Sequence, residues 1–223
     1  MSLVLTNIGT LVTNDPTING GLLGEIHNVA LIERDGVIEW VGPATELEAM
    51  TDSRPIDLAG RCVLPGFVDS HAHPVFAGNR ASEFEARMAG QRYSAGGIQS
   101  TVDATRGAGD AVLRAGLQRL VTEMHACGIT TFEAKSGYGL DVGTAERSLK
   151  IAREFTSETT FLGAHVVPIE YADNPEEYVA LVTDEMLEHC APFAKWIDVF
   201  CDRGAFSLEH TRTILNAGIQ HGL

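Results

Sequence analysis

The chain has 223 residues, of which 44% are hydrophobic and 21% charged, a balance typical of a globular protein rather than a disordered one. Lys and Arg number 16 and Asp and Glu number 30, so the formal net charge of −14 excludes nucleic acid as an expected partner. No run of about 18 uncharged apolar residues predicts a membrane helix, and residues 1–13 lack a basic leader segment, so we expect no membrane association and a cytoplasmic protein.

The N-terminal part of the sequence predicts strands. Asp35 and Gly36 form a turn pair between residues 30–34 and 37–41, and such a pair tolerates the positive φ angles of a two-residue hairpin. No helical periodicity stands out before Ala44. We therefore expect a small β domain over residues 1–62.

From residue 61 onward the pattern changes to strand–helix alternation. The apolar run 62–69 predicts a buried strand, and segment 70–109 is too long to be structureless unless it is functional or partly helical. Further strands are predicted at 129–135, 159–165 and 197–201, with helices from Asp110, over 144–155, over 174–189 and from Ser207. Four such units predict a parallel α/β fold, either an open doubly wound sheet or a (β/α)8 barrel.

Two histidines end the first of these strands. In an extended backbone, residues two apart point to the same face, so His71 and His73 can bind one metal ion. Neutral imidazoles suit zinc or iron, and a catalytic site needs at least one further protein ligand and an open position. From the residues alone, a metal pair and two surface histidines stay open as alternatives.

The sequence segments around these histidines resemble those of a known family. Pro65–His73 resembles the metal-binding signature of the amidohydrolase superfamily, metal-dependent hydrolases on a (β/α)8 barrel, and Asp35–Pro43 resembles the small β-sandwich beside many such barrels. Four further segments are similar to the imidazolonepropionase family of histidine degradation: Val75–Arg80 with Glu83–Glu85, Glu133–Leu140, Phe161–Pro168 and Val199–Cys201. The resemblance implies part of a β-sandwich in residues 1–62 and, in 63–223, only the first four β/α units of a TIM barrel.

The resemblance also implies a role for each site residue. His71 and His73 would be ligands of one zinc or iron ion, and Arg80 would bind the propionate carboxylate of the substrate. Tyr138 would hydrogen-bond the substrate, and His165 would contact its ring carbonyl and polarise it as a catalytic residue. Each of these residues also has a structural alternative: Arg80 could be a solvated surface arginine, Tyr138 a packed tyrosine and His165 a capped histidine.

The implied activity is hydrolysis of a small molecule, the cyclic amide 4-imidazolone-5-propanoate, to N-formimino-L-glutamate, by a homodimer in the full-length form. The family takes another metal-binding His and an acid from its fifth strand and an Asp from its eighth. This sequence ends about where the fifth strand would begin, so we expect a truncated chain. Another amidohydrolase acting on a cyclic amide or amino-heterocycle, and a non-catalytic fragment, stay open as alternatives.

Two other groups of residues carry expectations. Glu133 and Lys135 share one strand face, where they could lie near the metal, form a buried ion pair or be a solvated strand end. The four cysteines are widely spaced and form no CxxC pair, so we expect reduced and mostly buried thiols.

Overall fold

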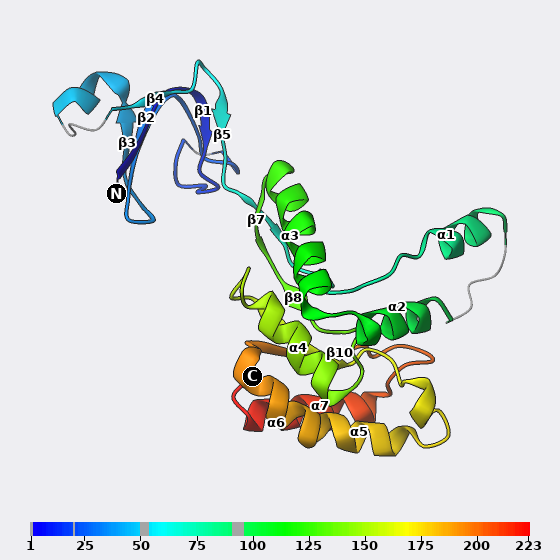
Figure 1. Ribbon diagram of the computed structural model, residues 1–223. Helices are drawn as coiled ribbons and strands as arrows, with labels where there is room; N and C mark the ends of the chain where they lie inside the picture. The colour runs from blue at the N-terminus through cyan, green and yellow to red at the C-terminus, as the bar shows by residue number, and fades with distance from the viewer. Residues whose placement is uncertain (1, 20, 50–53, 91–95) are drawn as a thin grey trace. The chain divides into compact units, whose positions relative to one another are not determined.

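The computed structural model describes residues 2–19, 21–49, 54–90 and 96–223. The chain divides into two compact units, Met1–Gly66 and Phe67–Leu223 (Figure 1). The predicted domains differ from these units only in residues 63–66, and the assignment of the first domain to a β-sandwich stays a prediction.

The first unit is built on one five-stranded sheet. Its strands are β1 (Ser2–Val12), β2 (Glu25–Arg34), β3 (Val37–Pro43), β4 (Ile56–Asp57) and β5 (Cys62–Val63), and the 3-10 helix η1 (Ala44–Ala49) follows β3. β1 pairs antiparallel with β2, and β2 with β3, whereas β4 and β5 run parallel to β1. The hairpin between β2 and β3 is confirmed, because Asp35 and Gly36 have φ angles of 52° and 84°.

In the described residues of the second unit, every strand pair is parallel. Its strands are β6 (Phe67–Asp69), β7 (Ile129–Phe132), β8 (Ala134–Lys135), β9 (Thr159–Ala164) and β10 (Trp196–Val199). β6 pairs with β7, β8 with β9 and β9 with β10. Only Glu133 separates β7 from β8, and its N–H donates to the Asp69 carbonyl at 2.8 Å. The two short sheets therefore follow one another as one series of parallel strands.

Helices connect these strands, as parallel pairing requires. They are α1 (Ala81–Met88), α2 (Gly96–Gly107), α3 (Asp110–Ala126), α4 (Val142–Ala152), η2 (Ile169–Tyr171), α5 (Pro175–Thr183), α6 (Glu185–Cys190), η3 (Ala191–Phe193) and α7 (Leu208–Gln220). α1 to α3 lie between β6 and β7, α4 lies between β8 and β9, α5 and α6 lie between β9 and β10, and α7 follows β10. Figure 1 shows α4 to α7 gathered along β9 and β10, which they contact. The predicted α/β class is confirmed.

Helix boundaries agree with the sequence in part. Ser207 caps α7 as predicted, since its hydroxyl accepts a hydrogen bond from the N–H of His210. Asp110 is the first residue of α3 rather than its cap, a position that Gly109 takes. The predicted helix 174–189 is two helices, because the backbone of Asp184 leaves the helical region with φ −115° and ψ −101°.

The helices bury their apolar faces against the strands. The larger core cluster of the second unit holds Leu149, Phe161, Tyr178 and Leu187, and a smaller one surrounds Leu117. Burial of this kind is the main favourable contribution to folding.

The expectation of mostly buried thiols is wrong. Only Cys190, inside the larger cluster, is buried, whereas Cys62, Cys127 and Cys201 are exposed. Cys127 is the C-terminal cap of α3 and Cys201 lies just beyond β10, so two of the exposed thiols follow the ends of elements. Within the described residues, no helix is both long and apolar enough to cross a membrane.

Candidate metal and substrate site

Three predicted histidines lie together beyond the ends of the parallel strands. His71 and His73 follow β6, and their ring centroids lie 5.3 Å apart. His165 directly follows β9, and its ring stacks on that of His73 with centroids 4.8 Å apart. His73 thus lies between His71, two positions before it in the chain, and His165, which comes from a strand that does not pair with β6.

A glycine makes room for this stack. A Cβ atom on Gly137 would lie 2.7 Å from Nδ1 of His165 and 2.8 Å from Nδ1 of His73, closer than real Cβ atoms come. Nδ1 of His165 lies 2.7 Å from the Gly137 carbonyl oxygen. Because a carbonyl oxygen only accepts, Nδ1 carries the proton and, in the neutral ring, Nε2 presents a lone pair.

Burial keeps both stacked rings neutral. Burial, helped by the neighbouring imidazoles of His165 and His71, lowers the pKa of His73 to about 3. Burial also lowers the pKa of His165, and the hydrogen bond to Gly137, which raises the pKa, only partly offsets this effect. A neutral imidazole has a lone pair available for a metal ion, whereas an imidazolium has none.

Tyr138 connects the histidines to a pocket. Its ring centroid lies 5.6 Å from those of both His73 and His165. On its other side a cavity of about 380 Å³ is lined by Tyr138 together with Phe76, Gly78, Asn79, Arg80, Thr101 and Arg119. The structure therefore brings all five predicted site residues into one region, with Arg80 in the pocket beside the histidine cluster.

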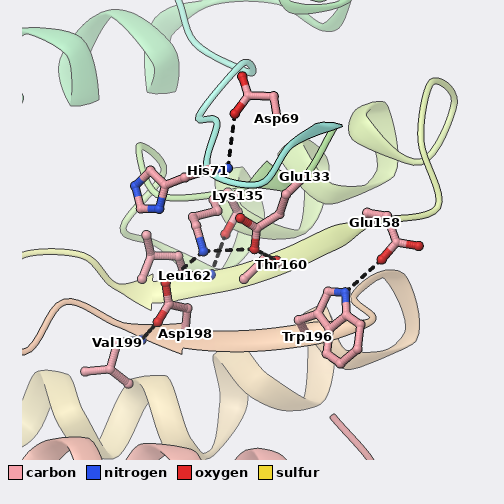
Figure 2. Close-up of polar contacts among 11 residues, drawn as sticks. Asp69, His71, Glu133, Lys135, Glu158, Thr160, Leu162, Trp196, Asp198 and Val199 are labelled. Atoms are coloured by element: carbon pink, nitrogen blue, oxygen red, sulfur yellow. Dashed lines mark hydrogen bonds and ion pairs between the residues drawn. The ribbon is translucent and has the colours of Figure 1, made fainter. Parts of the chain in front are cut away.

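A buried ion pair lies below this cluster (Figure 2). Nζ of Lys135 donates to Oε1 of Glu133 at 2.9 Å and to Oδ2 of Asp198 at 2.8 Å. The Lys135 side chain is only 6% exposed. Burial by itself lowers the pKa of Lys135, but the bonds to Asp198 and Glu133 outweigh it and the pKa is raised. Of the three alternatives for Glu133 and Lys135, the ion pair is confirmed.

The histidines have the chemistry to bind a metal ion, but they are too few to form a complete site. Nδ1 of His73 is buried and has no hydrogen-bond partner among the described residues. That lone pair and the neighbouring imidazole of His71 suit zinc or iron. In the described part of the chain, however, no group of three or more His, Cys, Asp or Glu side chains could hold a metal ion. A catalytic metal normally takes at least three protein ligands, so His71 and His73 form part of a site.

Two contributors to this region were not predicted. Asp198 lies on β10 and completes the bonding of Lys135. Gly137 provides the space for the two rings. Asp198 lies within the predicted strand 197–201 but ends up near the end of β10, which closes at Val199, and the close approach to Gly137 depends on three segments meeting and leaves no local signal.

Comparison with solved structures supports the fold. A triazine hydrolase from Arthobacter aurescens superimposes with a TM-score of 0.62 at 17% identity, over 100% of this chain and 51% of the other. Atrazine chlorohydrolase TrzN from Arthrobacter aurescens TC1, complexed with zinc, gives 0.59 at 16% identity over 99% and 51%. Guanine deaminase from C. acetobutylicum gives 0.56 at 14% identity over 100% and 52%. At such low identity the likeness shows only that this chain shares its fold with about half of each of these proteins.

Comparison of sequences gives much closer relatives, although no family model matches the chain. Imidazolonepropionases from Mycolicibacterium smegmatis and Salinispora tropica are 56% and 57% identical over 222 residues. That of Streptomyces coelicolor is 53% identical over 223 residues. Each alignment covers 100% of this chain and 56% of the relative. The resemblance to imidazolonepropionases is therefore confirmed along the whole chain, which spans a little over half the length of these relatives.

Proposed function

We propose that this sequence encodes part of an imidazolonepropionase, a metal-dependent hydrolase that converts 4-imidazolone-5-propanoate to N-formimino-L-glutamate in histidine degradation. The observation that carries the proposal is the identity of 53% to 57% along the whole chain to enzymes of that name. The cluster of His71, His73, Tyr138 and His165 beside the Arg80 pocket supports it. A cytoplasmic location and a homodimer of the full-length form belong to the same proposal.

The fold proposal goes with the function. We take the second unit as the first half of a (β/α)8 barrel, and the first unit as part of a β-sandwich. A barrel gathers its active site at the carboxyl ends of its strands. In support, His71 and His73 follow β6, Tyr138 follows β8 and His165 follows β9.

The proposed reaction breaks the ring C–N bond of the amide, adding hydroxyl to the carbonyl carbon and a proton to the nitrogen. Held by His71 and His73, a zinc or iron ion would supply a Lewis acid and lower the pKa of water to about 7. Arg80 would bind the propionate carboxylate, which its planar fork matches. The N–H at Nδ1 of His165 is already bonded to the Gly137 carbonyl oxygen. His165 can therefore donate to the ring carbonyl oxygen of the substrate only when its Nε2 is also protonated.

A second candidate is that the 223-residue chain recognises the substrate without turning it over. In the described residues the histidines lack a third ligand. The leaving nitrogen also needs a proton carrier, and the carboxylates of Glu133 and Asp198 are both bonded to Lys135. Binding without turnover is the expected behaviour in that case.

One experiment separates these candidates. The purified chain, loaded with zinc or with iron, is assayed for loss of imidazolone absorbance and titrated calorimetrically with imidazole-4-propanoate, a ring-and-carboxylate analogue that cannot be hydrolysed. Turnover that His73→Ala abolishes supports the enzyme, and binding without turnover supports the second candidate. Absence of both contradicts the proposed function. Tighter binding of guanine than of the propanoate favours an amidohydrolase for amino-heterocycles instead.

A further inference from the structure

Two consecutive residues in the last turn of α2 are bonded to the two loops that carry Arg80 and Tyr138. We propose that Thr105 and Arg106 are positioning residues, which hold Arg80 and Tyr138 beside each other in their common pocket. The proposal rests on the proposed function, because it takes these two side chains as the groups that bind the substrate.

Arg106 holds the loop that carries Tyr138. Its Nε donates to the carbonyl oxygen of Gly139 at 2.7 Å, and its NH2 donates to that of Leu140 at 3.1 Å. Its guanidinium also pairs with Asp141 at 3.0 Å and with Glu170 at 2.8 Å. Leu140 has a φ of 56°, a conformation that is unfavourable for a residue with a side chain. The loop therefore depends on bonds from outside, and Arg106 provides them.

Thr105 holds the loop that carries Arg80. Its side chain is fully buried, and its hydroxyl accepts a hydrogen bond from the N–H of Ala77 at 3.1 Å, three residues before Arg80. Its carbonyl oxygen accepts from NH2 of Arg147 at 3.0 Å, and Arg147 also donates to the Ala108 carbonyl at 3.0 Å. These bonds fix the end of α2 against α4.

The same helix also forms a wall of the pocket. Thr101, one turn before Thr105 and on the same face of α2, lines the cavity with Arg80 and Tyr138. A shift at the end of α2 would therefore move both loops and one wall together. Substrate binding is sensitive to such shifts, since a misplacement of about 1 Å can cost a hundredfold in rate. Arg106 should be irreplaceable by lysine, because one ammonium cannot reproduce the two directed bonds of the fork.

The test reads the position of Tyr138 independently of ligand binding. The chain is labelled with 3-fluorotyrosine, and the ¹⁹F signal of Tyr138 is assigned by its loss in Tyr138→Phe. Arg106→Gln should shift or broaden that signal and weaken binding of imidazole-4-propanoate by about tenfold or more. Arg106→Lys should recover only part of both effects. Thr105→Val should weaken binding while leaving the Tyr138 signal nearly in place.

Arg114→Gln is the matched control. Arg114 makes a two-bond contact of 2.6 Å and 2.6 Å with Glu154, and neither residue lines the pocket. It should change neither the Tyr138 signal nor the affinity. Equal effects of Arg114→Gln and Arg106→Gln would overturn the proposal.

A double variant shows whether Arg106 acts through Tyr138. In the Tyr138→Phe background, Arg106→Gln should weaken binding by a smaller factor than in the wild-type chain, and a full additional loss would overturn the positioning role. If circular dichroism shows that Arg106→Gln does not fold, Arg106→Lys tests the proposal instead, through the ¹⁹F signal of Tyr138 and the affinity for imidazole-4-propanoate. If the unmodified chain does not bind the analogue, the proposed function fails, and an unmoved Tyr138 signal in the Arg106 variants would separately overturn the positioning role.

Discussion

Gly137 lies against two imidazole rings at the point where the loop after β8 crosses the ends of β6 and β9. Any side chain at this position meets Nδ1 of both His165 and His73 within 2.8 Å. Gly137→Ala should therefore lower the free energy of unfolding by about 1–3 kcal/mol, the usual cost of overpacking. Urea denaturation followed by circular dichroism measures this loss.

Gly143 provides the matched control in α4. The nearest atom to a Cβ at Gly143 is 3.7 Å away, which is ordinary contact. Gly143→Ala should change stability by no more than about 1 kcal/mol, and in the favourable direction, because alanine loses less backbone entropy in a helix. Equal urea midpoints for the two variants would contradict the close approach at Gly137.

Arg80 is expected to recognise the carboxylate of the substrate. A charge-assisted pair contributes about 1.5–3 kcal/mol, so Arg80→Ala should weaken binding of imidazole-4-propanoate by about 10- to 100-fold. Imidazole-4-propanamide, which carries no charge, should bind wild type and variant alike. Calorimetry with both ligands measures the difference, and an unchanged affinity for the acid would remove Arg80 from the carboxylate site.

The residues of the site differ in how far a sequence can predict them. The alternation of an extended backbone allows His71 and His73 to face one metal ion, but it leaves two surface histidines as an alternative. The roles of Tyr138 and His165 were expected from the family resemblance. Arg106 gave no such signal, because its role depends on a helix meeting a loop 33 residues away. A long-range contact of this kind has no periodicity to reveal it.

At the scale of elements, patterns that are local in sequence predict well. The hairpin at Asp35 and Gly36 and the strand endings near Asp69 and Lys135 follow from turn chemistry and apolar runs. The break at Asp184 was not predicted, since residues 174–189 carry a continuous helical pattern, yet the structure has two helices there, both in contact with β9. Tertiary packing overrides local propensity there.

The pair β9–β10 has a polar contact near the start of each strand. Glu158 accepts hydrogen bonds from Nζ of Lys195 at 2.6 Å and from Nε1 of Trp196 at 3.0 Å (Figure 2 shows the second). The bond from Lys195, and to a smaller extent that from Trp196, holds the pKa of Glu158 below its usual value of 4.5. The contact therefore stabilises the fold above pH 4.5, and the contribution is lost as the pH falls through the lowered pKa.

Glu158→Gln should make this dependence visible. The amide lacks the charge that holds Lys195, so the variant should be less stable than wild type at pH 7. The difference in unfolding free energy should shrink steadily below about pH 4.5. Urea titrations at several pH values, read by Trp196 emission in a Trp40→Phe background, measure it. A difference that does not vary with pH would exclude the ionised contact.

At the scale of the whole molecule, the second unit has an open series of strands. Within the described residues β6 pairs only with β7 and β10 only with β9, so each has one free edge. Large apolar side chains near these edges are exposed: Phe67 by 54%, Val68 by 66% and Trp196 by 48%. Unpaired strand edges with apolar side chains are templates for association. We therefore expect the free edges of β6 and β10 to promote self-association of the chain.

Two valines of equal exposure test that expectation. Val68 on β6 and Val37 on β3 are both 66% exposed, so replacing either with lysine adds one charge and removes the same apolar surface. Val68→Lys should lower the fraction of associated chain in sedimentation velocity, because a lysine on an edge strand blocks pairing. Val37→Lys should leave that fraction unchanged. A monomeric wild-type chain at about 100 μM, or equal effects of the two lysines, would show that the strands of the second unit do not drive association.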